Sequence, residues 1–170
     1  MLPEALNDPY ILTALAAVIT LLVYWQRTLS WSEYRTIHSL KRAVLPVVDA
    51  HTSLFVVSRK GFRNDGEYVT TVNKPLRETF VKLSNDGFSP HLINSIKLRE
   101  HPDHGNQYSA AHLVKFHDDG YQSEIYLFDE GNQTDIYAHL ERDVFDPKAH
   151  LDDTDLQDGD VRDVLPKWVS

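Results

Sequence analysis

Histidine is the residue type in this sequence with the most capacity for chemistry, at nine of 170 residues. His101, Asp103 and His104 stand within four positions, in the run His-Pro-Asp-His-Gly. Imidazoles and carboxylates bind zinc and other transition metals when a fold brings three or four of them together. We therefore predict a candidate metal site at these three residues. A solvated loop is the structural alternative, since His-x-x-His beside proline and glycine is common in loops.

Further histidines lie on the strands that follow this run. His112 and His117 are five positions apart on one predicted strand, so they face opposite sides of the sheet. His139 lies on a neighbouring strand. Glu124 and Asp135 also project from strands, but no spacing pairs them for acid–base catalysis.

The sequence carries none of the common nucleophile or phosphate-binding motifs. It has no cysteine, no Gly-x-Ser-x-Gly, no Walker-type loop and no Gly-x-Gly-x-x-Gly. We assign no catalytic residue and expect no cofactor in the leading interpretation, which is not an enzyme.

The C-terminal segment, residues 141–170, is acidic, and the whole chain has a net charge of −8. That charge excludes a general nucleic-acid binder, which needs a basic surface. An EF-hand also fails, because placing Gly159 at the sixth position puts leucines at the third and twelfth. We expect Asp152, Asp153, Asp155 and Trp168 to contact a protein partner. A solvated acidic tail, with Trp168 docked on the domain itself, is the alternative.

An uncharged apolar run covers residues 9–26 and predicts a transmembrane helix. As a helix it spans roughly 27 Å, close to the hydrocarbon thickness of a bilayer. Tyr10, Tyr24 and Trp25 stand at its ends, where aromatic side chains favour the membrane interface. A buried core helix and a cleaved signal peptide are the alternatives.

The cations beside this run predict its orientation. The N-terminal flank has no lysine or arginine, whereas Arg27, Arg35, Lys41 and Arg42 follow the run. Cations stay on the cytoplasmic side. We therefore expect residues 1–8 to lie outside the cell membrane and the larger C-terminal part to be cytoplasmic.

A juxtamembrane amphipathic helix is predicted over residues 30–48. Ser30 and Glu33 have capping-box spacing, and Pro46 is expected to kink or end the helix because it lacks an amide donor. Its apolar stripe favours two interpretations. The stripe faces lipid while the cations meet anionic headgroups, or it packs on the following domain.

Residues 53–140 are predicted to form an α+β domain with a small, mostly antiparallel sheet and one helix packed on it. Strands are expected over 53–58, 68–72 and 92–99, with a helix from about Pro75 to a glycine C-cap at Gly87. Residues 110–117 and 121–128 form a hairpin around Asp119-Gly120, and 134–140 adds a third strand. Helices are expected to cover one face of the sheet.

The C-terminal third shows a family resemblance. It resembles small membrane-anchored proteins of unassigned role encoded by actinobacterial phages. The resemblance implies a place in the host membrane and assigns no catalytic residue. It rests on Ile125-Tyr126-Leu127-Phe128, Asp135-Ile136-Tyr137-Ala138-His139, Pro147-Lys148-Ala149-His150-Leu151, Gly159-Asp160 and Val164-Leu165-Pro166.

Three hypotheses of function follow. The leading one is a single-pass membrane protein whose cytoplasmic domain binds another, unidentified protein, with membrane lipid as its other partner; tethering raises the local concentration of the domain. The second is a membrane-anchored metal-dependent hydrolase that uses the His101–His104 cluster with His112 or His139. The third is a holin-like protein that permeabilises membranes.

Overall fold

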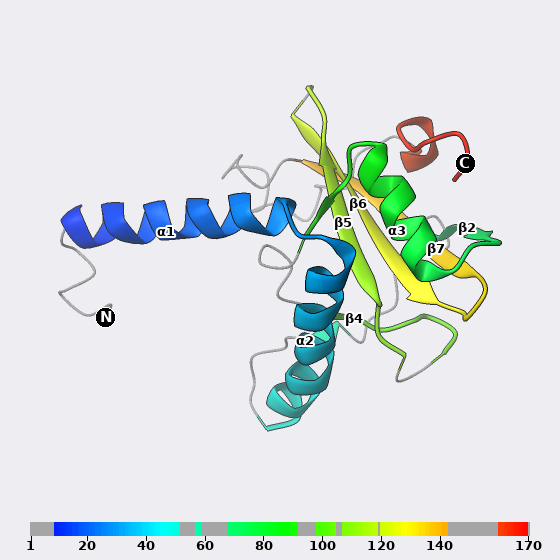
Figure 1. Ribbon diagram of the computed structural model, residues 1–170, viewed down its shortest axis with the longest axis horizontal. Coiled ribbons are helices and arrows are strands. Elements are labelled where there is room, and N and C mark those ends of the chain that lie inside the picture. Colours follow the sequence, from blue (N-terminus) through cyan, green and yellow to red (C-terminus); the bar gives the residue numbers. More distant parts are fainter. Residues whose placement is uncertain are drawn as a thin grey trace.

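The computed structural model describes residues 9–51, 57–58, 68–91, 98–104, 107–118, 120–142 and 160–169. Its helices and five-stranded antiparallel sheet confirm the α+β class (Figure 1). The predicted tail over residues 1–8, most of the strand expected over 53–58, and Asp152, Asp153 and Asp155 lie outside the described residues.

Helix α1 (Pro9–Arg27) projects away from the sheet (Figure 1). Its apolar side chains stay exposed, and its length and composition are sufficient for a membrane span. Within the described residues, its C-terminal end contacts the domain. Gln26 is buried there, and the guanidinium of Arg27 lies 4.7 Å from the centre of the Phe116 ring.

Helix α2 (Trp31–His51) starts with half of the expected capping box. The Ser30 N–H donates to Glu33 Oε2 at 2.9 Å, which satisfies one of the free donors at the helix start. Pro46 does not end the helix, contrary to one of the two expected effects, because α2 continues to His51. Proline removes a single amide donor, and the flanking turns propagate past it.

Five strands form the main sheet in the order β2–β7–β6–β5–β3, all antiparallel. The meander β5–β6–β7 matches the hairpin and third strand predicted from the turn residues. Of the two edge strands, β2 was predicted and β3 was not, because β3 is only two residues long. The bounds are β2 (Tyr68–Val72), β3 (Ser89–Pro90), β5 (Ala111–Phe116), β6 (Tyr121–Asp129) and β7 (Thr134–Arg142).

A short parallel pair stands apart from this sheet. It consists of β1 (Val57–Ser58) and β4 (Leu98–Arg99), which are the described ends of two predicted strands.

Helix α3 (Leu76–Asn85) packs on one face of the sheet and ends at the predicted glycine. Gly87 has φ +92°, and the Phe88 N–H reaches back to Leu83 O at 3.1 Å. The core on this face joins α3, the sheet, Tyr34 of α2 and the end of the chain around η3 (Val161–Asp163). Its members include Phe80, Leu83, Leu113, Ile125, Leu127, Ile136, Val161, Leu165 and Val169.

Candidate metal centre

Four polar side chains meet on the face of the sheet opposite α3. His91 directly follows β3, His112 lies on β5, Glu124 on β6 and His139 on β7. The strand register brings them together. Glu124 is paired directly with His139, and the His91 N–H donates to His112 O at 3.0 Å. Side chains directly opposite each other on neighbouring strands lie close on the same face, so all four converge.

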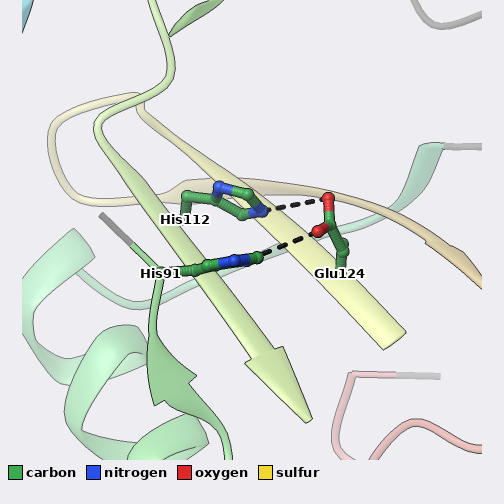
Figure 2. Close-up of side chains that lie close together, drawn as sticks. All are labelled: His91, His112 and Glu124. Carbon is green, nitrogen blue, oxygen red and sulfur yellow. Dashed lines mark hydrogen bonds and ion pairs between the residues drawn. The ribbon is translucent and has the colours of Figure 1, made fainter. Parts of the chain in front are cut away.

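The three histidines surround the carboxylate of Glu124. His91 Nδ1 lies 3.3 Å from Glu124 Oε1, and His112 Nε2 lies 3.2 Å from Oε2 (Figure 2). His139 Nε2 lies 3.5 Å from the same Oε2. One ligand atom each from His91, His112 and Glu124 can be chosen within 4.8 Å of one another.

The contacts of His91 and His112 with Glu124, at 3.3 and 3.2 Å, suit ligands of one metal ion. With metal–ligand bonds of about 2.0–2.1 Å, two ligand atoms of a tetrahedral site lie about 3.3 Å apart. The His112 contact is also a hydrogen bond, at the long end of the ordinary N–H···O range of about 2.7–3.2 Å. His139 is not among the residues whose ligand atoms all lie within 4.8 Å of one another. Within the described residues, neither ring nitrogen of His91 makes a hydrogen bond, despite the approach of Nδ1 to Glu124.

Two neutral donors hold the carboxylate in place. The Tyr126 hydroxyl donates to Glu124 Oε2 at 2.7 Å, and the Gln122 side-chain amide donates to Oε1 at 3.3 Å. Burial, reinforced by the Glu124 charge, raises the pKa of Tyr126 well above its usual value, so the hydroxyl keeps its proton. Such outer partners orient a metal-ligating carboxylate.

The site is buried, and the guanidinium of Arg99 lies near it, 5.0 Å from the centre of the Tyr126 ring. His91, His112, Glu124 and His139 are each at most 7% exposed. Burial lowers the pKa of His112 to about 3, so this imidazole is neutral at pH 7. Burial alone would raise the pKa of Glu124, but His112 and the close approach of the other two imidazoles hold it well below its usual range.

The described groups that touch the Glu124 carboxylate are therefore imidazoles, a phenol and a carboxamide, and none of them is a permanent cation. A buried charge is costly unless it is paired or coordinates a metal. A neutral His112 imidazole beside an ionised carboxylate also matches the protonation states that metal binding requires.

The metal site predicted from sequence lies elsewhere. The rings of His101 and His104 are tilted by 31° with centres 4.6 Å apart, and the two residues form a second cluster with Glu130. Asp103 is not a member of this cluster. Its backbone N–H and that of His104 both donate to His101 Nδ1, at 3.1 and 3.2 Å. That nitrogen is thereby occupied as an acceptor, and the neutral ring carries its proton on Nε2, 3.5 Å from Asp135 Oδ2. The prediction of a metal at His101 stays a prediction.

Trp168, expected at a partner surface, contacts its own domain. Its indole Nε1–H donates to Asp86 Oδ2 at 2.6 Å, and Lys82 Nζ lies 3.8 Å from the ring centre. The side chain is half-buried against the core.

The residues predicted at the membrane interface are placed along α1 and α2. Tyr10, Tyr24 and Trp25 are exposed on α1. Arg35 is exposed, whereas Lys41 and Arg42 are half-buried. Burial lowers the pKa of Lys41 to about 8.

Comparison with known proteins adds no family. No family model, no curated protein and no solved structure matches this chain. The resemblance to membrane proteins of actinobacterial phages therefore stays a prediction.

Proposed function

We propose that this chain is a membrane-anchored metalloprotein that holds one divalent transition-metal ion between His91, His112 and Glu124. The supporting observation is a buried carboxylate with imidazole nitrogens of His91 and His112 at 3.3 and 3.2 Å, in a set whose ligand atoms all lie within 4.8 Å of one another. The bound ion would place a positive charge directly at the Glu124 carboxylate.

The donor set favours ions of the zinc type. Imidazole nitrogen suits Zn²⁺, Fe²⁺, Ni²⁺ and Cu²⁺, whereas Ca²⁺ and Mg²⁺ prefer oxygen ligands. Within this group the affinity of nitrogen and oxygen sites rises toward copper and zinc. We take Zn²⁺ as the reference ion for this site.

The burial of the site favours a closed, structural centre over hydrolysis. A catalytic metal keeps an open position for water or substrate, while a structural metal is enclosed by four protein ligands. His91, His112 and Glu124 are each at most 6% exposed, which fits the enclosed kind, and His139 Nε2 lies beside them, 3.5 Å from Glu124 Oε2. In this role the metal ties β5, β6 and the end of β3 together.

The membrane part of the proposal rests on α1. Its uncharged residues are exposed, and its length is that of a span. The cations that follow it favour a cytoplasmic C-terminal domain at the cell membrane. Confinement there would raise the concentration of the metal-binding domain near any protein partner.

Metal content of the full-length chain tests the proposal. The protein, carrying a tag without histidine, is purified in detergent without chelators, and its metals are measured by elemental analysis. We expect close to one equivalent of a first-row ion in the wild type. His112→Gln and Glu124→Gln should lose most of it, and His117→Gln, outside both clusters, should retain it.

A second measurement does not depend on these variants folding. Stripping the wild type with a chelator and adding back Zn²⁺ should lower and then restore the unfolding temperature, because the ion binds only the folded state. A wild type with no metal and no response to Zn²⁺ would leave only a hydrogen-bonded network around Glu124. Metal loss in His104→Gln alone would assign the ion to the second cluster.

A further inference from the structure

Helix α2 has three unlike flanks. The first is buried in the protein and carries Tyr34 and His38. The second faces α3, where Ser32, Arg35 and Ser39 line a groove of about 870 Å³ together with Arg77. The third flank lies outside the core cluster and, apart from Thr36, outside this groove.

This third flank is apolar and exposed. Leu40, Val44 and Val47 follow one another at helical spacing and are 65%, 45% and 58% exposed. Between Glu33 and His51 the flank carries no charge. Its members are Thr36, Leu40, Ala43, Val44, Val47 and Ala50.

The direction of α2 relative to α1 indicates that the third flank of α2 contacts the lipid bilayer. Only three residues separate the two helices, so α2 starts where the candidate span ends. In Figure 1, α2 runs across the direction of α1, with the sheet and α3 on one side and α1 projecting on the other. If α1 crosses a bilayer, α2 lies along its surface.

We infer that α2 lies in the headgroup region of the bilayer that α1 spans, with Leu40, Val44 and Val47 against the acyl chains. This inference rests on the proposed membrane anchor. An interfacial helix buries one apolar flank at the boundary of headgroups and acyl chains. Here its other flanks hold the domain, so the helix would fix the domain's orientation on the membrane.

If α2 lies at the bilayer surface, it also fixes where the proposed metal centre lies relative to the lipid. Tyr34, on the buried flank, accepts a hydrogen bond of 2.8 Å from the His112 N–H. Helix α2 therefore holds the backbone of β5 at His112, one of the proposed metal ligands.

Single-cysteine labelling tests the inference, since the chain has no cysteine of its own. A spin label is placed in turn at residues 40, 44 and 47 of the full-length protein in phosphatidylethanolamine–phosphatidylglycerol vesicles. Collisions with oxygen, which concentrates in lipid, are compared with collisions with a water-soluble nickel chelate. Leu40→Cys, Val44→Cys and Val47→Cys should favour oxygen.

Three control positions make the result decisive. Ser39→Cys, in the groove, and Val81→Cys, an exposed apolar site on α3, should favour the nickel chelate. Val18→Cys in α1 should favour oxygen. If position 18 lies in lipid and positions 40, 44 and 47 lie in water, the inference fails and the anchor stands. If all four lie in water, the anchor fails as well. Spin–spin broadening confined to positions 40, 44 and 47 would show that the third flank binds a second copy of the chain, and the inference would fail.

Discussion

At the scale of single residues, buried histidines set the response of this protein to acid. His38 is 2% exposed, and its Nε2–H donates to Ser109 O at 2.8 Å. Burial lowers its pKa to about 4, although the hydrogen bond to Ser109 opposes this shift. The imidazole is therefore neutral in the folded protein at pH 7, whereas in the unfolded chain it gains a proton near about pH 6.5.

His38→Gln should flatten the pH dependence of stability. In the wild type, the contribution of His38 to the free energy of unfolding is complete above about pH 6.5, and about 3 kcal/mol of it is lost as pH falls to 4, because the unfolded chain binds the proton first. Denaturant unfolding of the detergent-solubilised protein between pH 7 and 4 measures this. In His38→Gln, the free energy of unfolding should still fall somewhat with falling pH, because burial also lowers the pKa of His112. Ser39→Ala, an exposed change on the same helix, is the control, and identical slopes in wild type and His38→Gln would contradict the assignment.

At the scale of elements, the end of α3 shows how a local signal positions a core helix. The Gly87 N–H donates to Ser84 O and the Phe88 N–H to Leu83 O, both at 3.1 Å, which is a Schellman ending. A Cβ on Gly87 would meet Lys115 Cε at 3.6 Å, an ordinary contact. The need for glycine therefore comes from its positive φ and not from space.

Gly87→Ala should lower the free energy of unfolding by about 1–2 kcal/mol, the cost of a left-handed conformation with a Cβ. Gly87→Asn should lose less, because asparagine tolerates this conformation at helix ends. Denaturant unfolding at pH 7 compares the three proteins. Equal stability of Gly87→Ala and wild type would show that α3 does not end with a left-handed residue at position 87.

At the scale of the whole molecule, the candidate membrane span is followed by the domain that carries the proposed metal centre. The end of α1 is joined firmly to the domain, since Gln26 and Leu29 are both buried. The side of the membrane on which the domain lies therefore determines whether the proposed metal centre is exposed to metal ions inside or outside the cytoplasm.

Protease protection in cells tests that orientation. With a tag after Ser170, we expect the C-terminal part to resist protease in intact cells and to be cut after permeabilisation, because cations flank α1 on its C-terminal side. Cutting in intact cells would reverse the orientation and place the proposed metal centre outside the cytoplasm.

Local rules were enough to predict the elements. The apolar run, the Asp119-Gly120 turn and Gly87 each act within a few residues, so α1, the meander and the end of α3 follow from the sequence. The same hairpin register pairs Glu124 with Val114 and thus places it diagonally from His112 on one face. The turn after β6 likewise sets Glu124 opposite His139. These pairings were predictable from the turns, and a search restricted to histidines close in sequence, such as His101 and His104, does not find them.

His91 was decided by the tertiary structure alone. It joins the cluster because β3, a strand of two residues, pairs with β5 more than twenty residues later. So short a strand has no periodicity, and its pairing depends on where α3 ends and packs. The burial that makes His112 neutral and Glu124 a candidate ligand is likewise a property of the assembled sheet. The sequence by itself determined the elements and the candidate membrane span. Packing at long range decided which polar residues meet, because their contacts join segments that no local pattern links.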